Sequence, residues 1–179
     1  MISILRCFWA YVKMGSSKFI WIFLFSLGFC VLIRLIQMEK KNIFFRIMFS
    51  IACSFIFVMT LFGRTKGNHG VISKPFESYL RAFSGNNAEQ QLQIIMNIVM
   101  YIPFGAFLPR CFRNLEKCRY VISIAVICSS SIEIIQRLFN IGLLEVDDII
   151  NNVLGATIGV LLYKLTIKIQ DIFMNIRTK

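Results

Sequence analysis

Residues 91–109 read QLQIIMNIVMYIPFGAFLP and contain no charged side chain. A helix that crosses a bilayer needs about 20 mainly apolar residues, so this stretch predicts a transmembrane helix. Four further stretches are comparably apolar, and they are residues 19–38, 43–62, 120–139 and 149–167. The sequence therefore predicts an all-α integral membrane protein, a bundle of about five transmembrane helices.

The composition of the whole chain agrees with this class. Of its 179 residues, 57% are hydrophobic and 16% are charged, and the mean hydropathy is +0.70. A soluble domain averages about 45–50% apolar and about 25% charged residues. The formal net charge is +11, but most basic residues sit in short gaps between apolar runs, as they do in cytoplasmic membrane loops. We therefore expect membrane lipid as a partner and no nucleic acid.

The six cysteines and the single histidine show no spacing that is typical of a zinc site. Three of the cysteines lie inside apolar runs, where a thiol packs as a small hydrophobic group. We predict no metal and no cofactor. The N-terminal segment has no small-residue cleavage site, so we expect no removable signal.

Five parts follow from this pattern. They are an N-terminal interfacial segment (1–18), the first two transmembrane helices (19–63), an outer loop (64–90), a three-helix core (91–167) and a cytoplasmic tail (168–179). With five spans, 12 of the 20 Lys and Arg residues fall on the side of the C-terminus. The strongest local signal is the basic loop at 110–119. Because basic loops stay in the cytoplasm, we predict an outer N-terminus and a cytoplasmic C-terminus.

Polar side chains recur on one face of each of the last three predicted spans. Ionisable and amide groups are costly in hydrocarbon, so they usually face a bundle interior or a water-filled cavity. Glu133, Gln136 and Asn140 share a helical face, as do Asp148 and Asn152 on the next span. The candidate ligand-binding residues are Asn97, Glu133, Gln136, Asp147, Asp148 and Asn152.

Structural alternatives remain open for these residues. Buried Asn and Gln side chains often serve only as hydrogen bonds between membrane helices, and Asp147 and Asp148 could cap the last helix. Close helix packing fully explains the GxxxG motif at 155–159. We expect Pro103 to kink or end the third span. The helix-packing candidates are Pro103, Gly105, Gly155 and Gly159.

Three motifs in residues 91–163 resemble the VanZ-like family of membrane proteins, which is associated with low-level teicoplanin resistance. These motifs are NIVMYIPFG at 97–105, EIIQ at 133–136 and EVDDIINNVLG at 145–155. The resemblance implies an envelope protein of a Gram-positive bacterium with a link to glycopeptide resistance. Two features depart from the family pattern. Glu145 replaces the more usual aspartate, and residues 141–144 (IGLL) lack the arginine that many members carry before the acidic run.

Three functions are compatible with these residues. We favour a protein without catalysis that binds an amphiphile, either a lipoglycopeptide antibiotic, a lipid-linked cell-wall precursor or a phospholipid, in a polar pocket open to the outer leaflet. The alternative is an intramembrane enzyme in which Glu133 or Asp148 acts as general base, with Arg137 as the nearest cation in the sequence. A small transporter fits less well, because five spans without an inverted repeat would require oligomerisation.

Overall fold

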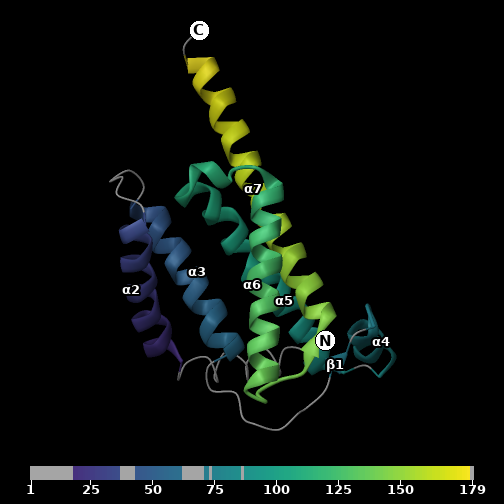
Figure 1. The fold of residues 1–179 in the computed structure, drawn as a ribbon. Helices are drawn as coiled ribbons and strands as arrows, with labels where there is room; N and C mark the ends of the chain where they lie inside the picture. The colour runs from purple at the N-terminus through teal and green to yellow at the C-terminus, as the bar shows by residue number, and fades with distance from the viewer. Residues whose placement is uncertain (1–17, 37–42, 62–70, 73, 86, 178–179) are drawn as a thin grey trace.

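The computed structural model describes residues 18–36, 43–61, 71–72, 74–85 and 87–177, and the chain folds as a helical bundle (Figure 1). The predicted N-terminal interfacial segment lies almost entirely outside these residues. The elements are α2 (Phe19–Ile36), α3 (Ile43–Leu61), β1 (Val71–Ile72), α4 (Glu77–Ser84), α5 (Ala88–Cys111), the 3₁₀ helix η1 (Arg113–Leu115), α6 (Cys118–Leu138), β2 (Leu144–Glu145) and α7 (Val146–Arg177).

Among the described residues, four helices are long and apolar enough to cross a membrane: α3, α5, α6 and α7. The first predicted span corresponds to α2, which is apolar over the shorter stretch Ile20–Arg34. The predicted all-α membrane bundle is therefore confirmed. Its core is formed by apolar side chains from α2, α3, α5, α6 and α7, including Ile33, Phe49, Met100, Val121 and Val160.

Helices α5 and α7 run in the same direction and touch along their backbones. A Cβ added to Gly155 would lie 2.1 Å from the Ile98 carbonyl oxygen, and one added to Gly159 would lie 2.1 Å from that of Ile102. One added to Gly105 would lie 2.1 Å from the carbonyl oxygen of Ala156. These three glycines therefore permit an approach that any larger residue would prevent.

Pro103 does not end the third span, contrary to that part of our expectation. Helix α5 continues to Cys111 with both Pro103 and Pro109 inside it. A proline removes one backbone donor, but neighbouring helices in a membrane bundle can satisfy the carbonyl group that is released.

Asn140 is also not on the helical face that its spacing predicts, because α6 ends at Leu138 and Asn140 occupies an exposed turn with a φ of 55°.

Helix α7 is longer than the predicted fifth span. It begins at Val146 and continues to Arg177, so most of the predicted tail is helical and projects beyond the bundle (Figure 1). The segment predicted as an outer loop also has structure. It contains α4 and β1, and β1 pairs in parallel with β2, Val71 opposite Leu144 and Ile72 opposite Glu145.

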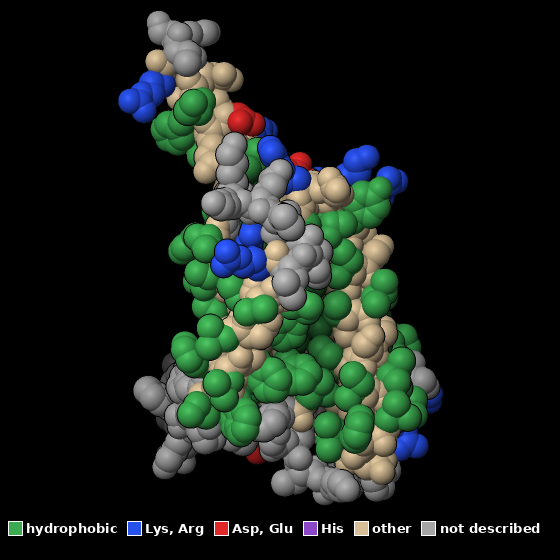
Figure 2. Space-filling view, turned by 60° about the vertical axis from the view of Figure 1, so that its left-hand side comes forward, with side chains coloured by type: hydrophobic (Ala, Val, Ile, Leu, Met, Phe, Trp, Pro, Cys, Tyr) green, Lys and Arg blue, Asp and Glu red, His purple; other side chains and the backbone are tan. Residues whose placement is uncertain are grey.

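The two ends of the bundle differ in charge. At the end where α5 terminates, here called the basic end, Arg110 donates to the Thr166 hydroxyl at 2.7 Å and stacks on the rings of Phe45 and Tyr163. Figure 2 shows hydrophobic side chains over the length of the bundle and many of the Lys and Arg side chains toward the end from which α7 projects. The opposite end, where α5 and α7 begin, is called the site end.

Candidate functional site

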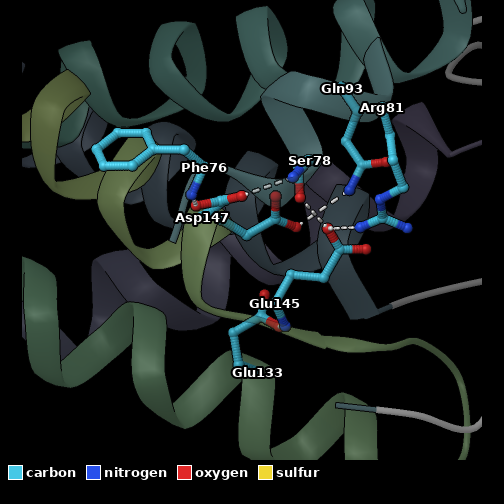
Figure 3. Close-up of polar contacts among 8 residues, drawn as sticks. Phe76, Ser78, Arg81, Gln93, Glu133, Glu145 and Asp147 are labelled. Carbon is cyan, nitrogen blue, oxygen red and sulfur yellow. Dashed lines mark hydrogen bonds and ion pairs between the residues drawn. The ribbon is translucent and has the colours of Figure 1, made fainter. Parts of the chain in front are cut away.

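Asp147 joins the first turn of α7 to the beginning of α4. One of its oxygens accepts the backbone N–H of Phe76 at 2.6 Å, and the other accepts that of Ser78 at 2.8 Å (Figure 3). The side chain is only 1% exposed. Backbone N–H groups in the first turn of a helix have no partner within that helix, and a carboxylate there is favoured. Asp147 therefore caps a helix, as one of our alternatives held, but the helix is α4 rather than its own.

Glu145, Ser78 and Arg81 form a second set of contacts at this end. The Ser78 hydroxyl donates to the Glu145 carboxylate at 2.7 Å, and an Arg81 nitrogen lies 3.8 Å from the same oxygen (Figure 3). Glu133 of α6 reaches the same place, because its carboxylate accepts the backbone N–H of Glu145 at 3.0 Å. The structure therefore brings Glu133 and Glu145 together, with Arg81 beside Glu145.

Asp148 extends this group toward α5. Its carboxylate accepts a hydrogen bond from the Gln93 amide at 3.1 Å. Gln93 precedes Asn97 by one helical turn, so the two side chains share a face of α5. Glu133, Asp147 and Asp148 are 2%, 1% and 8% exposed, and all three carboxylates are thus buried where an unpaired charge would be strongly disfavoured.

Amide side chains continue the polar group deeper into the bundle. Asn152 donates to the Ser129 hydroxyl of α6 at 2.8 Å, and the Tyr79 hydroxyl donates to the amide oxygen of Asn151. Within the described part of the chain, three buried amide atoms have no hydrogen-bond partner: Asn97 Nδ2, Asn151 Nδ2 and Asn152 Oδ1. Buried polar atoms are nearly always paired, and these three have hydrogen-bonding capacity that no described residue satisfies.

Gln136 behaves differently from the other candidates. Its amide donates to the backbone carbonyl of Thr60 at 2.9 Å and thereby joins α6 to the end of α3. Although it lies one turn from Glu133, this contact is directed at α3 and not at α4 or α7. Gln136 is therefore placed as a link between helices.

The surroundings of the Tyr79 hydroxyl in α4 shift its pKa. Burial and then the negative charges of Asp147 and Asp148 raise the pKa of the Tyr79 hydroxyl above its ordinary value of 10.0. The neutral hydroxyl is the form that donates to Asn151. The cluster therefore favours the protonated state that the hydrogen bond requires.

Sequence reasoning missed several residues of this site, and they are Ser78, Tyr79, Arg81, Gln93, Ser129 and Asn151. Gln93 could have been found, since it precedes Asn97 on the polar face of the same span. Arg81 could not, because nothing in the linear sequence connects it with an acidic run more than sixty residues later. Arg137, the cation that the sequence favoured, is exposed at the end of α6. Among the residues that the structure describes, no three Cys, His, Asp or Glu side chains are grouped so that they could hold a metal ion.

The helical bundle and its buried polar end define a multi-pass membrane protein. A family model described as VanZ/LLP1 matches residues 43–169, and the chain belongs to this family, as the motifs predicted. Protein VanZ from Enterococcus faecium is 35% identical over 79 residues, which cover 42% of this chain and 47% of that relative. The match thus spans about half the length of the relative. No solved structure matches the chain.

Proposed function

We propose that this VanZ-like protein binds the headgroup of an amphiphile at its site end, without catalysis. The observation that carries the proposal is the set of buried amide atoms without a partner on α5 and α7, namely Asn97 Nδ2, Asn151 Nδ2 and Asn152 Oδ1. A ligand that both donates and accepts hydrogen bonds would satisfy them. Leaving them unsatisfied would cost about 1–3 kcal/mol per group.

The chemistry of the neighbouring groups narrows the ligand class. The carboxylates of Glu133 and Asp148 accept hydrogen bonds, whereas the Gln93 amide donates one. Arg81 adds a positive charge whose Nε and one terminal nitrogen have no hydrogen-bond partner among the described residues. Such a mixture suits a headgroup rich in hydroxyl, amide or phosphate groups. A lipid-linked cell-wall precursor, a phospholipid and a lipoglycopeptide such as teicoplanin all have one. The family resemblance favours a role in the envelope of a Gram-positive bacterium and in glycopeptide resistance.

The proposed orientation places the site end at the outer leaflet, the N-terminus outside and the C-terminus in the cytoplasm. Its support is the basic end, where Arg110, Arg113, Lys117 and Arg119 lie within a short segment. Clusters of Lys and Arg beside membrane helices favour the cytoplasmic side. The acidic cluster, defined as Glu133, Glu145, Asp147 and Asp148, would then lie at the level of the outer leaflet.

Binding is tested by purifying the protein in lipid nanodiscs and identifying retained lipids by mass spectrometry. We expect a lipid with a large polar headgroup to be enriched over its share of the membrane. Glu133→Gln keeps the shape of the side chain and an oxygen that can accept the Glu145 N–H, but removes the charge. It should abolish enrichment, whereas Glu89→Gln in the exposed first turn of α5 should not. Retention of lipids in membrane proportions by the parent protein would contradict the proposal.

The same substitutions can be tested in cells that depend on the protein for teicoplanin resistance. Glu133→Gln should remove resistance at unchanged membrane abundance, and Glu89→Gln should preserve it. If Glu133 acts only as a buried hydrogen-bond partner, the amide would replace the carboxyl group and resistance would survive.

One observation favours the enzyme as a second candidate. Sites that handle phosphate usually place Arg or Lys beside their acidic groups, and Arg81 lies 3.8 Å from Glu145. Glu133 or Asp148 would then serve as general base. Chemical change of a retained lipid during incubation in nanodiscs, lost in Glu133→Gln, would favour this candidate over simple binding.

A further inference from the structure

Helix α4 turns large apolar side chains outward and packs a polar side chain against the protein. Leu80 and Phe83 of α4 are 68% and 67% exposed, and Phe76, the residue directly before the helix, is 59% exposed. Ser78 and Ala82, on the other face, are 5% and 0% exposed. A surface helix in water buries its apolar stripe and exposes its polar one, so α4 has the reverse arrangement.

Two polar side chains of α4, Ser78 and Arg81, are partnered by the rest of the protein. Ser78 donates to Glu145, Arg81 forms an ion pair with the same carboxylate, and Asp147 accepts the N–H groups that begin the helix. Figure 3 shows the Phe76 ring pointing away from these acidic groups. An arginine can remain in a membrane when it faces the protein and is paired with an acidic group.

Helix α4 is also continuous with the part of the protein that lipid surrounds. It packs on α5, and the Gln91 amide donates to the Ala82 carbonyl at 3.0 Å. Helix α5 is a candidate membrane span that exposes Ile95 and Val99. Helix α4 therefore packs against a helix that is long and apolar enough to cross a membrane and that exposes apolar side chains.

We propose that α4 is inserted in the leaflet at the site end, with Phe76, Leu80 and Phe83 among the lipid acyl chains. An amphipathic helix in a membrane interface buries its apolar face about 5–10 Å into the headgroup and acyl boundary. Here that face is directed outward from the protein. Helix α4 then forms the wall between the acidic cluster and the bilayer, and the contacts of Asp147 fix its position.

Tryptophan fluorescence in lipid tests this placement. In a background in which Trp9 and Trp21 are replaced by Phe, Leu80→Trp and Phe83→Trp are introduced separately. Both positions are exposed, so neither substitution should disturb the core, and unchanged thermal unfolding checks this. Asn114→Trp, in the exposed turn at the basic end, is the matched control.

We expect lipids brominated in their acyl chains to remove most of the emission from Leu80→Trp and Phe83→Trp, whereas aqueous iodide should change it little. Asn114→Trp should respond in the opposite way. Strong quenching of the α4 positions by iodide would place α4 in water and overturn the proposal. Protection from both quenchers would also overturn it, because it would mean that a second protein surface covers this face. Neither result depends on the proposed ligand.

Discussion

Gly155 offers the most direct test of how α5 and α7 are held together. Gly155→Ala places a Cβ 2.1 Å from the Ile98 carbonyl oxygen and 3.0 Å from the Tyr101 Cβ, and real Cβ atoms essentially never approach within 3.0 Å. The backbone oxygen cannot rotate away as the end of a flexible side chain could. The two helices must therefore separate.

The size of the effect follows from that separation. Relief of the overlap needs a movement of about 1 Å, and a gap of this size forfeits roughly a quarter to a half of the attraction in each facing contact. Overpacking of this kind destabilises proteins by about 1–3 kcal/mol. Gly28→Ala on α2 is the matched control, because among the described residues no atom lies within 4 Å of a Cβ at that position. It changes only helix propensity, which favours alanine by up to about 1 kcal/mol.

The assay is reversible unfolding in mixed micelles, with the free energy of unfolding obtained for the parent and each variant. We expect Gly155→Ala to lower that free energy by about 1–3 kcal/mol, and Gly28→Ala to leave it unchanged or raise it slightly. Gly159→Ala should resemble Gly155→Ala, since its Cβ would lie 2.1 Å from the Ile102 carbonyl oxygen. If the variants at 155 and 28 agreed within about 0.5 kcal/mol, the reasoning would be refuted.

Four further outcomes are expected. Asp147→Ala should release the first turn of α4, because two backbone N–H groups lose their acceptor, and hydrogen exchange should rise in α4 but not in α6. Burial and nearby carboxylates raise the pKa of Tyr79 above 10.0. The free energy of unfolding should therefore fall as the pH rises from 10 through the folded-state pKa. Tyr79→Phe should lack this dependence in alkaline unfolding. Arg81→Gln should weaken lipid retention in nanodiscs more than Arg81→Lys. An impermeant thiol reagent added to intact cells should not label Cys118, whereas introduced cysteines at 141–146 should react, and the reverse pattern would sink the proposed orientation.

The sequence predicted the spans well because hydropathy over a helix length depends only on local composition. It also predicted that a backbone would approach Gly155 and Gly159, but not which one. A GxxxG motif defines a smooth surface on its own helix and contains no information about the partner. That Ile98 and Ile102 of α5 supply the opposing carbonyl oxygens follows only from the arrangement of the helices.

Helix α4 shows why part of the site could not be predicted. Residues 77–84 (ESYLRAFS) are short and mixed in polarity, so they were assigned to a loop. Hydropathy is an average over a window of residues. A short helix with one polar and one apolar face therefore has the same average as a polar loop. The distinction depends on Asp147 and Glu145, which come more than sixty residues later.

The arginine beside the acidic residues is a second feature that the linear sequence did not predict. Residues 141–144 offer no cation, and the sequence suggested Arg137, which is exposed. In the folded protein Arg81 of α4 takes a position 3.8 Å from Glu145. Electrostatic pairing depends on distance in space and not on separation along the chain. The acidic cluster therefore has a cation beside Glu145 even though this chain lacks the arginine of the family motif.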